Sequence, residues 1–199
     1  MTSLALFAFF AFFLAAGFKR PFLWLLCYLY VDALAPQKIS WGLFSAIPVS
    51  LIAFLMAFGG WMAADRKDGV KFSGRQIMIV LLLAYCGLTT LMADFPQAAS
   101  EKWAWVWKSL FFAAFFPLTL RTRLRIEAAA LVVALSVGAI VISAGMKTAA
   151  SGGGYGVLQS FVNDNSGLYE GSTLSMVAIA IIPIIIWLAR YGTVFPSDW

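Results

Sequence analysis

Apolar and polar positions occur in long blocks along this chain. Seven apolar runs alternate with short connectors that carry most of the charge. The runs cover residues 3–18, 21–35, 43–64, 76–93, 102–120, 126–146 and 172–189. A helix that spans a bilayer core needs about 20 apolar residues. The pattern therefore predicts an all-α protein, a polytopic transmembrane helical bundle of about six or seven membrane segments.

The first two runs are short, and only Lys19 and Arg20 separate them. They form either two thin spans or a helical hairpin that does not cross the bilayer completely. Pro36 ends the second run, because proline disfavours helix in the residue before it. Pro48 is expected in the first turns of the third helix, and Pro183 is expected to kink the last one.

The composition favours the same class of protein. Hydrophobic residues make up 62% of the chain and charged residues 12%, whereas ordinary soluble domains carry about 25% charged residues. We therefore expect one transmembrane domain over residues 1–199 and no soluble domain. The net charge is +5, but the Lys and Arg residues are spread over the connectors and form no basic stripe with exposed aromatics, which excludes nucleic acid as a partner.

The Lys and Arg residues fall unequally on alternate connectors, and the cytoplasmic connectors of membrane proteins carry the excess. One set holds ten of them: Lys19, Arg20, Arg66, Lys67, Lys71, Arg75, Arg121, Arg123, Arg125 and Arg190. The opposite set holds three: Lys38, Lys102 and Lys147. The first set should be cytoplasmic, which places the N-terminus and the connector 147–171 on the outer side of the membrane.

Cysteine and histidine contribute little to the predicted chemistry. The two cysteines, Cys27 and Cys86, lie inside apolar runs, where a thiol behaves as a small hydrophobic group, and the chain has no histidine. We therefore expect no disulfide framework, no metal site and no cofactor.

The connector 147–171 is the longest and most polar part of the chain, and it begins at Lys147. Tyr155 lies in it among four glycines: Gly152, Gly153, Gly154 and Gly156. Glycines let backbone amides approach an anion closely, as in a phosphate cradle. A flexible turn is the alternative, because no Lys-Ser or Lys-Thr pair follows these glycines and no strand precedes them.

Asp164 and Asn165 follow in the same connector. Such side chains hydrogen-bond sugar hydroxyls, and a carboxylate can accept the proton of an attacking hydroxyl. Alternatively, they form turns or cap the following helix. Asp32 is a further candidate, since a carboxylate inside an apolar run indicates function by default, but its place just before Pro36 puts it near a membrane surface.

Two groups of short motifs resemble a known family. The first runs from Pro21 to Tyr30 and continues as Ala35-Pro36-Gln37-Lys38-Ile39-Ser40-Trp41-Gly42. The second comprises Gly152-Gly153-Gly154-Tyr155, then Asp164-Asn165, then Met176 and Pro183 in an apolar helix. Together they resemble the O-glycosylation ligases associated with exosortase A systems, which are membrane relatives of the O-antigen ligases and polymerases of polysaccharide biosynthesis.

The resemblance implies a glycan ligase in the bacterial inner (plasma) membrane. Such a ligase takes a glycan from an undecaprenyl-diphosphate carrier at the outer face and passes it to an acceptor, either a protein or a polysaccharide component. The expected partners are therefore the lipid-linked donor, the acceptor and membrane lipids. The residues expected to bind substrate are Lys147, Tyr155, Asp164 and Asn165.

The chain departs from the family pattern in two ways. Family members are longer, and the part that follows the matched region carries the Arg and His residues proposed for catalysis. We therefore expect this chain to be either the N-terminal region of a ligase, without the catalytic half, or a truncated relative. Ser166 stands where the family has a second Asn.

Two other functions fit the same composition. A transporter subunit would have charges or broken helices deep in the membrane. A non-catalytic membrane scaffold would have well-packed helices and no polar pocket near the outer loop.

Overall fold

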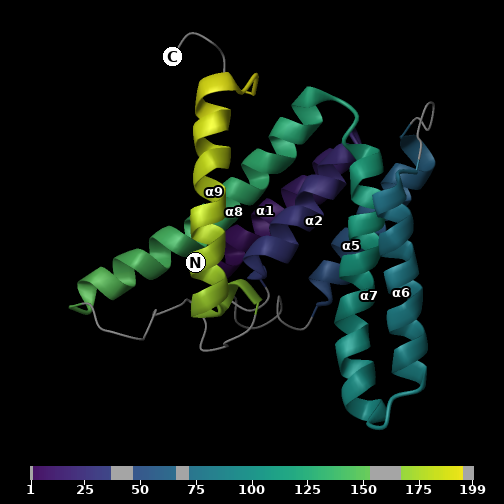
Figure 1. Cartoon of the computed structure of the whole chain (residues 1–199). Coiled ribbons are helices and arrows are strands. Elements are labelled where there is room, and N and C mark those ends of the chain that lie inside the picture. Colours follow the sequence, from purple (N-terminus) through teal and green to yellow (C-terminus); the bar gives the residue numbers. More distant parts are fainter. Residues whose placement is uncertain (1, 37–46, 66–71, 153–166, 195–199) are drawn as a thin grey trace. The chain divides into compact units, whose positions relative to one another are not determined.

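The computed structural model describes residues 2–36, 47–65, 72–152 and 167–194, and every regular element in these ranges is a helix (Figure 1). The helices are α1 (Thr2–Gly17), α2 (Phe22–Leu34), α5 (Val49–Ala64), α6 (Gly74–Leu91), α7 (Pro96–Thr119), α8 (Arg123–Ala150), the 3₁₀ helix η1 (Gly167–Tyr169) and α9 (Gly171–Tyr191). Each of the seven apolar runs overlaps one of the α-helices. The all-α prediction is confirmed for the described residues.

Three helices are long and apolar enough to cross a membrane. They are α6, α8 and α9, with 18, 28 and 21 residues. The apolar helices α1, α2 and α5 have only 16, 13 and 16 residues. At about 1.5 Å per residue, these three are shorter than the hydrocarbon core of about 30 Å. The described helices thus indicate a membrane protein with three clear spans, fewer than the six or seven expected.

Prolines cause two helices, α5 and α7, to begin at residues other than those that the apolar runs predict. α5 begins at Val49, directly after Pro48, and Ile47 is not helical. The expectation that Pro48 lies inside the helix is therefore wrong, because proline pushes the preceding residue out of the helical region. α7 begins earlier than expected, with Pro96 in its first turn, a position where the missing N–H costs nothing.

The chain forms two compact units. The first unit comprises residues 1–62 and 123–199, and the second comprises residues 63–122. Each is described by itself below.

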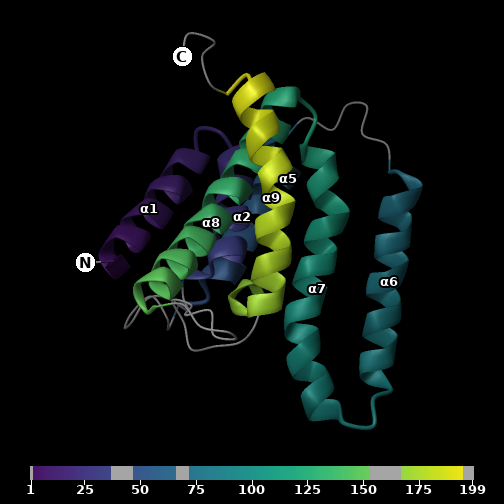
Figure 2. The same cartoon turned by 60° about the vertical axis from the view of Figure 1, so that its left-hand side comes forward.

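The first unit is built around α2, which packs against α1 and α8, while α8 packs against α9 (Figure 2). α1 runs antiparallel to α2, since Leu14 meets Trp24 and the ring of Phe9 lies 5.0 Å from that of Tyr30. α5 also reaches α2, where the rings of Tyr28 and Phe54 are 5.7 Å apart, edge to face. α2 is buried on all sides, since five consecutive residues, 24–28, are buried.

Trp24 fills the space between α1 and α5. Its indole Nε1 donates to the carbonyl of Leu14 at 2.9 Å, one of the carbonyls that the end of a helix leaves without an intrahelical partner. A Cβ atom at Gly17 would lie 2.1 Å from the indole ring, and one at Gly60 would lie 2.4 Å from it. The two glycines therefore let three helices approach one another closely.

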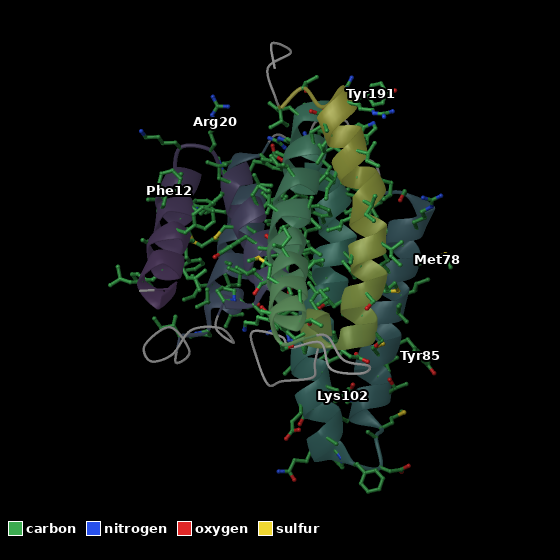
Figure 3. All side chains as sticks on the ribbon, turned by 90° about the vertical axis from the view of Figure 1, so that its left-hand side faces the viewer. Phe12, Arg20, Met78, Tyr85, Lys102 and Tyr191 are labelled. Carbon is green, nitrogen blue, oxygen red and sulfur yellow. The ribbon has the colours of Figure 1, made fainter. Side chains whose placement is uncertain are left out.

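The second unit is an antiparallel hairpin of α6 and α7. Ser73 and Gln76 form a capping box at the start of α6. The Gln76 side chain is 4% exposed, and its Nε2 donates to the carbonyl of Ala114 on α7 at 2.9 Å. The opposite face of α6 is exposed and apolar, as the labelled Met78 and Tyr85 illustrate (Figure 3), which suits a helix surrounded by lipid.

Candidate functional site

The structure places one of the four residues expected to bind substrate. Lys147 is exposed in the last turn of α8. Tyr155, Asp164 and Asn165 lie outside the described residues. The two ends of the connector 147–171 are described, and they define where the candidate site begins and ends.

The first end of the connector is a tight turn after α8. The amide of Ser151 donates to the carbonyl of Lys147 at 3.0 Å, and that of Gly152 donates to Ala149 at 3.2 Å. Gly152 has a φ of 88°, a backbone conformation that only glycine adopts at no steric cost. The first glycine of the motif therefore serves as a turn, in agreement with the turn alternative at that position.

The second end of the connector is fixed to α2. Tyr169 is 6% exposed, and its hydroxyl donates to the carbonyl of Leu34 at 2.5 Å across 135 residues of sequence. Burial raises the pKa of the Tyr169 phenol, and the nearby phenol of Tyr30 raises it further, so the hydroxyl keeps its proton and remains a donor.

Leu34 is the last residue of α2, and a helix end leaves such carbonyls without intrahelical partners. Ala35 follows in the left-handed region, with a φ of 44°, and its amide donates to the carbonyl of Val31 at 3.0 Å. The left-handed residue turns the chain out of α2, and Tyr169 supplies the donor that the Leu34 carbonyl would otherwise lack.

Glu170 is the N-cap residue of α9. Its carboxylate accepts hydrogen bonds from the hydroxyls of Ser172 at 2.8 Å and Thr173 at 3.2 Å. A carboxylate at a helix N-terminus is stabilised by the helix dipole. Glu170 thus occupies the N-cap position of α9, although its side chain makes no hydrogen bond to a backbone amide of the first turn.

Asp32 lies on α2, two residues before the Leu34 carbonyl, and its side chain is exposed. This agrees with the expectation that it lies near a helix end accessible to water. It lies on α2, the helix whose last residue, Leu34, accepts the hydrogen bond from Tyr169.

A second polar cluster, which the sequence reasoning missed, lies where α8 begins and α9 ends. Glu127 is 0% exposed. Its Oε1 accepts from Arg123 Nε at 2.7 Å, and its Oε2 accepts from the Thr193 amide at 2.6 Å, the Thr193 hydroxyl at 2.8 Å and the Val194 amide at 3.1 Å. Four hydrogen bonds thus compensate for burying this carboxylate.

The same cluster includes two further contacts. Arg123 also donates to the carbonyl of Tyr191, and the guanidinium carbon of Arg125 lies 5.0 Å from the centre of the Phe22 ring. Arg123 and Glu127 are spaced i, i+4 on α8, a spacing from which their ion pair could have been predicted. The partners on the chain after α9 are 66 and 67 residues away, and no local pattern reveals them.

Within the described ranges, no group of three or more Cys, Asp or Glu side chains is placed to hold a metal ion.

Comparison with known proteins gives one match. A family of unknown function (DUF5935) matches residues 1–193. No curated protein and no solved structure matches the chain.

Proposed function

The chain belongs to DUF5935, a family of unknown function, and we propose that it forms the N-terminal membrane region of a glycan ligase. The ligase would transfer a glycan from an undecaprenyl-diphosphate carrier to a protein or polysaccharide acceptor. The reaction would take place at the outer face of the bacterial inner membrane. The proposal rests on the resemblance of two groups of motifs and on where the fold brings them.

The hydrogen bond from Tyr169 to Leu34 is the observation that carries the proposal. It joins the end of the glycine-containing connector to the helix end from which residues 35–42 leave. The described chain segments that flank parts of the two motif groups, the end of α2 at Leu34 and the 3₁₀ helix before α9, are therefore side by side although 135 residues apart in sequence. This proximity is what a shared donor site requires.

The proposed roles follow from the charges of the side chains. Lys147 would stabilise the diphosphate as it leaves, because a fixed cation lowers the energy of the developing charge. The acceptor hydroxyl would attack the anomeric carbon as the bond to the diphosphate oxygen breaks, a base in the catalytic half of the ligase would accept the hydroxyl proton, and Asp164 would position the sugar or the acceptor. Tyr155 and Asn165 would orient the sugar.

The proposal includes a sidedness for the first unit. Arg20, Arg123, Arg125 and Arg190 lie at the end opposite to Tyr169, where α2 begins and α9 ends. An excess of basic residues favours the cytoplasmic side. The end with Tyr169 and Lys147 would then face outward, and α1, α2, α5 and α7 would cross the membrane together with the three clear spans.

The test uses the full-length protein in membranes that contain an undecaprenyl-diphosphate-linked glycan. Asp164→Ala should lower the rate of glycan transfer by about a hundredfold, the loss that misplacement of a substrate by about 1 Å can cause. Gln159→Ala is the matched control in the same connector and should keep the wild-type rate. Unchanged transfer by Asp164→Ala and Asn165→Ala would count against the proposal.

Tyr169→Phe tests the supporting contact separately. Removal of one buried hydrogen bond should cost about 0.5–1.5 kcal/mol of stability, and the rate of transfer should fall with it. Tyr85→Phe removes a hydroxyl from an exposed side chain on α6 and should change neither quantity. Transfer at the wild-type rate in Tyr169→Phe would show that the contact does not position the donor site.

A further inference from the structure

The end of the first unit opposite to Tyr169 gathers cations from three parts of the sequence. Arg20 precedes α2, whose first residue, Phe22, lies beneath Arg125. Arg123 donates to the carbonyl of Tyr191, which is adjacent to Arg190. Figure 3 shows Arg20 and Tyr191 at the same end of this unit. We call this set the basic end: Lys19, Arg20, Arg123, Arg125 and Arg190.

Glu127 connects the two helices of the basic end but does not cancel the positive charge of that end. The carboxylate is buried, and its oxygens are occupied by Arg123, Thr193 and Val194. It thereby holds the end of α9 against the start of α8. Among the described residues of this end, Glu127 pairs with Arg123 alone, so the other four cations of the basic end are not neutralised by it.

Exposed apolar side chains border the basic end. On α1, Phe12 is 66% exposed, and Phe18, which directly precedes Lys19, is 73% exposed (Figure 3). Near the end of α9, Ile186 is 49% exposed and Trp187 is 39% exposed. Cations beside an apolar surface match the two parts of a phospholipid, the phosphate of the headgroup and the acyl chains.

We propose that the basic end binds the headgroup phosphate of an anionic phospholipid. Guanidinium groups suit this ligand because they donate two parallel hydrogen bonds to phosphate oxygens. The contact with the Phe22 ring restricts the motion of the Arg125 side chain before any ligand binds. Arg125 therefore loses less conformational entropy when it binds a phosphate. A soluble phosphate would use the cations but not the apolar border, so the lipid is the ligand that fits both.

The test measures thermal unfolding of the detergent-solubilised full chain at increasing concentrations of short-chain phosphatidylglycerol. A ligand that binds only the folded state raises the unfolding temperature as its concentration passes its dissociation constant. Short-chain phosphatidylcholine and inorganic phosphate are measured in parallel. Phosphatidylglycerol should stabilise the protein at lower concentrations than either of them.

The variant Arg20→Gln/Arg125→Gln/Arg190→Gln removes three cations from the basic end. Each cation near an anionic surface contributes on the order of a fivefold change in affinity, so roughly a hundredfold more phosphatidylglycerol should be needed. The control Arg75→Gln/Lys102→Gln/Arg121→Gln removes three cations from the second unit and should keep the wild-type midpoint. If the first triple variant does not fold, Arg20→Gln and Arg190→Gln should each shift the midpoint by about fivefold.

Three results would overturn the proposal. Equal stabilisation by phosphatidylcholine would remove the need for an anionic headgroup. Equal stabilisation by inorganic phosphate would indicate a site for a soluble anion. An equal loss in the control variant would indicate diffuse attraction by the whole chain.

Discussion

The indole of Trp24 lies against two glycines, Gly17 on α1 and Gly60 on α5, and it is anchored by its hydrogen bond to Leu14. Trp24 is 9% exposed, so a residue with a side chain at either glycine meets a ring that has little room to move. The packing of the three helices therefore depends on the absence of a Cβ atom at two positions.

A pair of neighbouring substitutions tests this dependence. Gly60→Ala places a methyl group 2.4 Å from the Trp24 ring and should cost about 1–3 kcal/mol, as overpacking does. Gly59→Ala meets nothing within 4 Å and should be neutral or stabilising by up to about 1 kcal/mol, because alanine favours helix. Chemical unfolding in detergent micelles measures both. Equal stability of the two variants would contradict the packing described.

Glu127 permits a second residue-scale prediction. Glu127→Leu removes the acceptor of the Thr193 and Val194 amides and should loosen the end of α9, whereas Glu127→Gln keeps one acceptor and should do so less. The unfolding temperature and the rate of proteolysis after Tyr191 report the effect. Glu101→Gln, on an exposed side chain of α7, is the control. Wild-type behaviour of Glu127→Leu would show that the four hydrogen bonds do not stabilise this end.

At the scale of the element, the apolar pattern predicted the order of the α-helices in the described ranges, because membrane-type runs are long and continuous. It did not predict their ends. With Ser73 as its N-cap, α6 begins at Gly74, two residues before the apolar run starts, and Pro96 extends α7 into a polar segment. Caps and prolines decide helix ends, and hydropathy contains no information about them.

Gln76 connects α6 to α7 and gives the element-scale prediction. Gln76→Ala leaves the Ser73 amide without its side-chain acceptor and the Ala114 carbonyl without the Gln76 donor. The loss should be about 1–3 kcal/mol, the range for buried polar groups left unsatisfied. Gln97→Ala, at an exposed position of α7, should stay within about 0.5 kcal/mol of wild type. Chemical unfolding measures both variants, and equal values would contradict a stabilising role of the Gln76 bridge.

At the scale of the whole chain, the described polar contacts of the first unit concentrate at its two ends. Sequence analysis indicated Lys147 and the connector 147–171 as the chemically interesting part, and the structure places Lys147 and both connector ends. The sequence could not predict the hydrogen bond between Tyr169 and Leu34 or the one between Thr193 and Glu127. Those partners are 135 and 66 residues apart, and only the packing of helices brings them together.

Both proposals depend on which side of the membrane each end faces. The donor site requires that the Tyr169 end face the outer side of the membrane. The basic end, which is the proposed phospholipid site, would then face the cytoplasm, the side that an excess of basic residues favours. Ser151 marks the first end and is exposed, and Tyr191 marks the second and is 62% exposed. Each can therefore carry a cysteine for labelling after Cys27 and Cys86 have been replaced by alanine.

The most direct measurement is labelling of spheroplasts with a membrane-impermeant maleimide. Ser151→Cys should react in intact spheroplasts, and Tyr191→Cys should react only after the membrane is permeabilised. The opposite pattern, or equal labelling of both positions in intact spheroplasts, would contradict the proposed sidedness and with it the outer-face ligase.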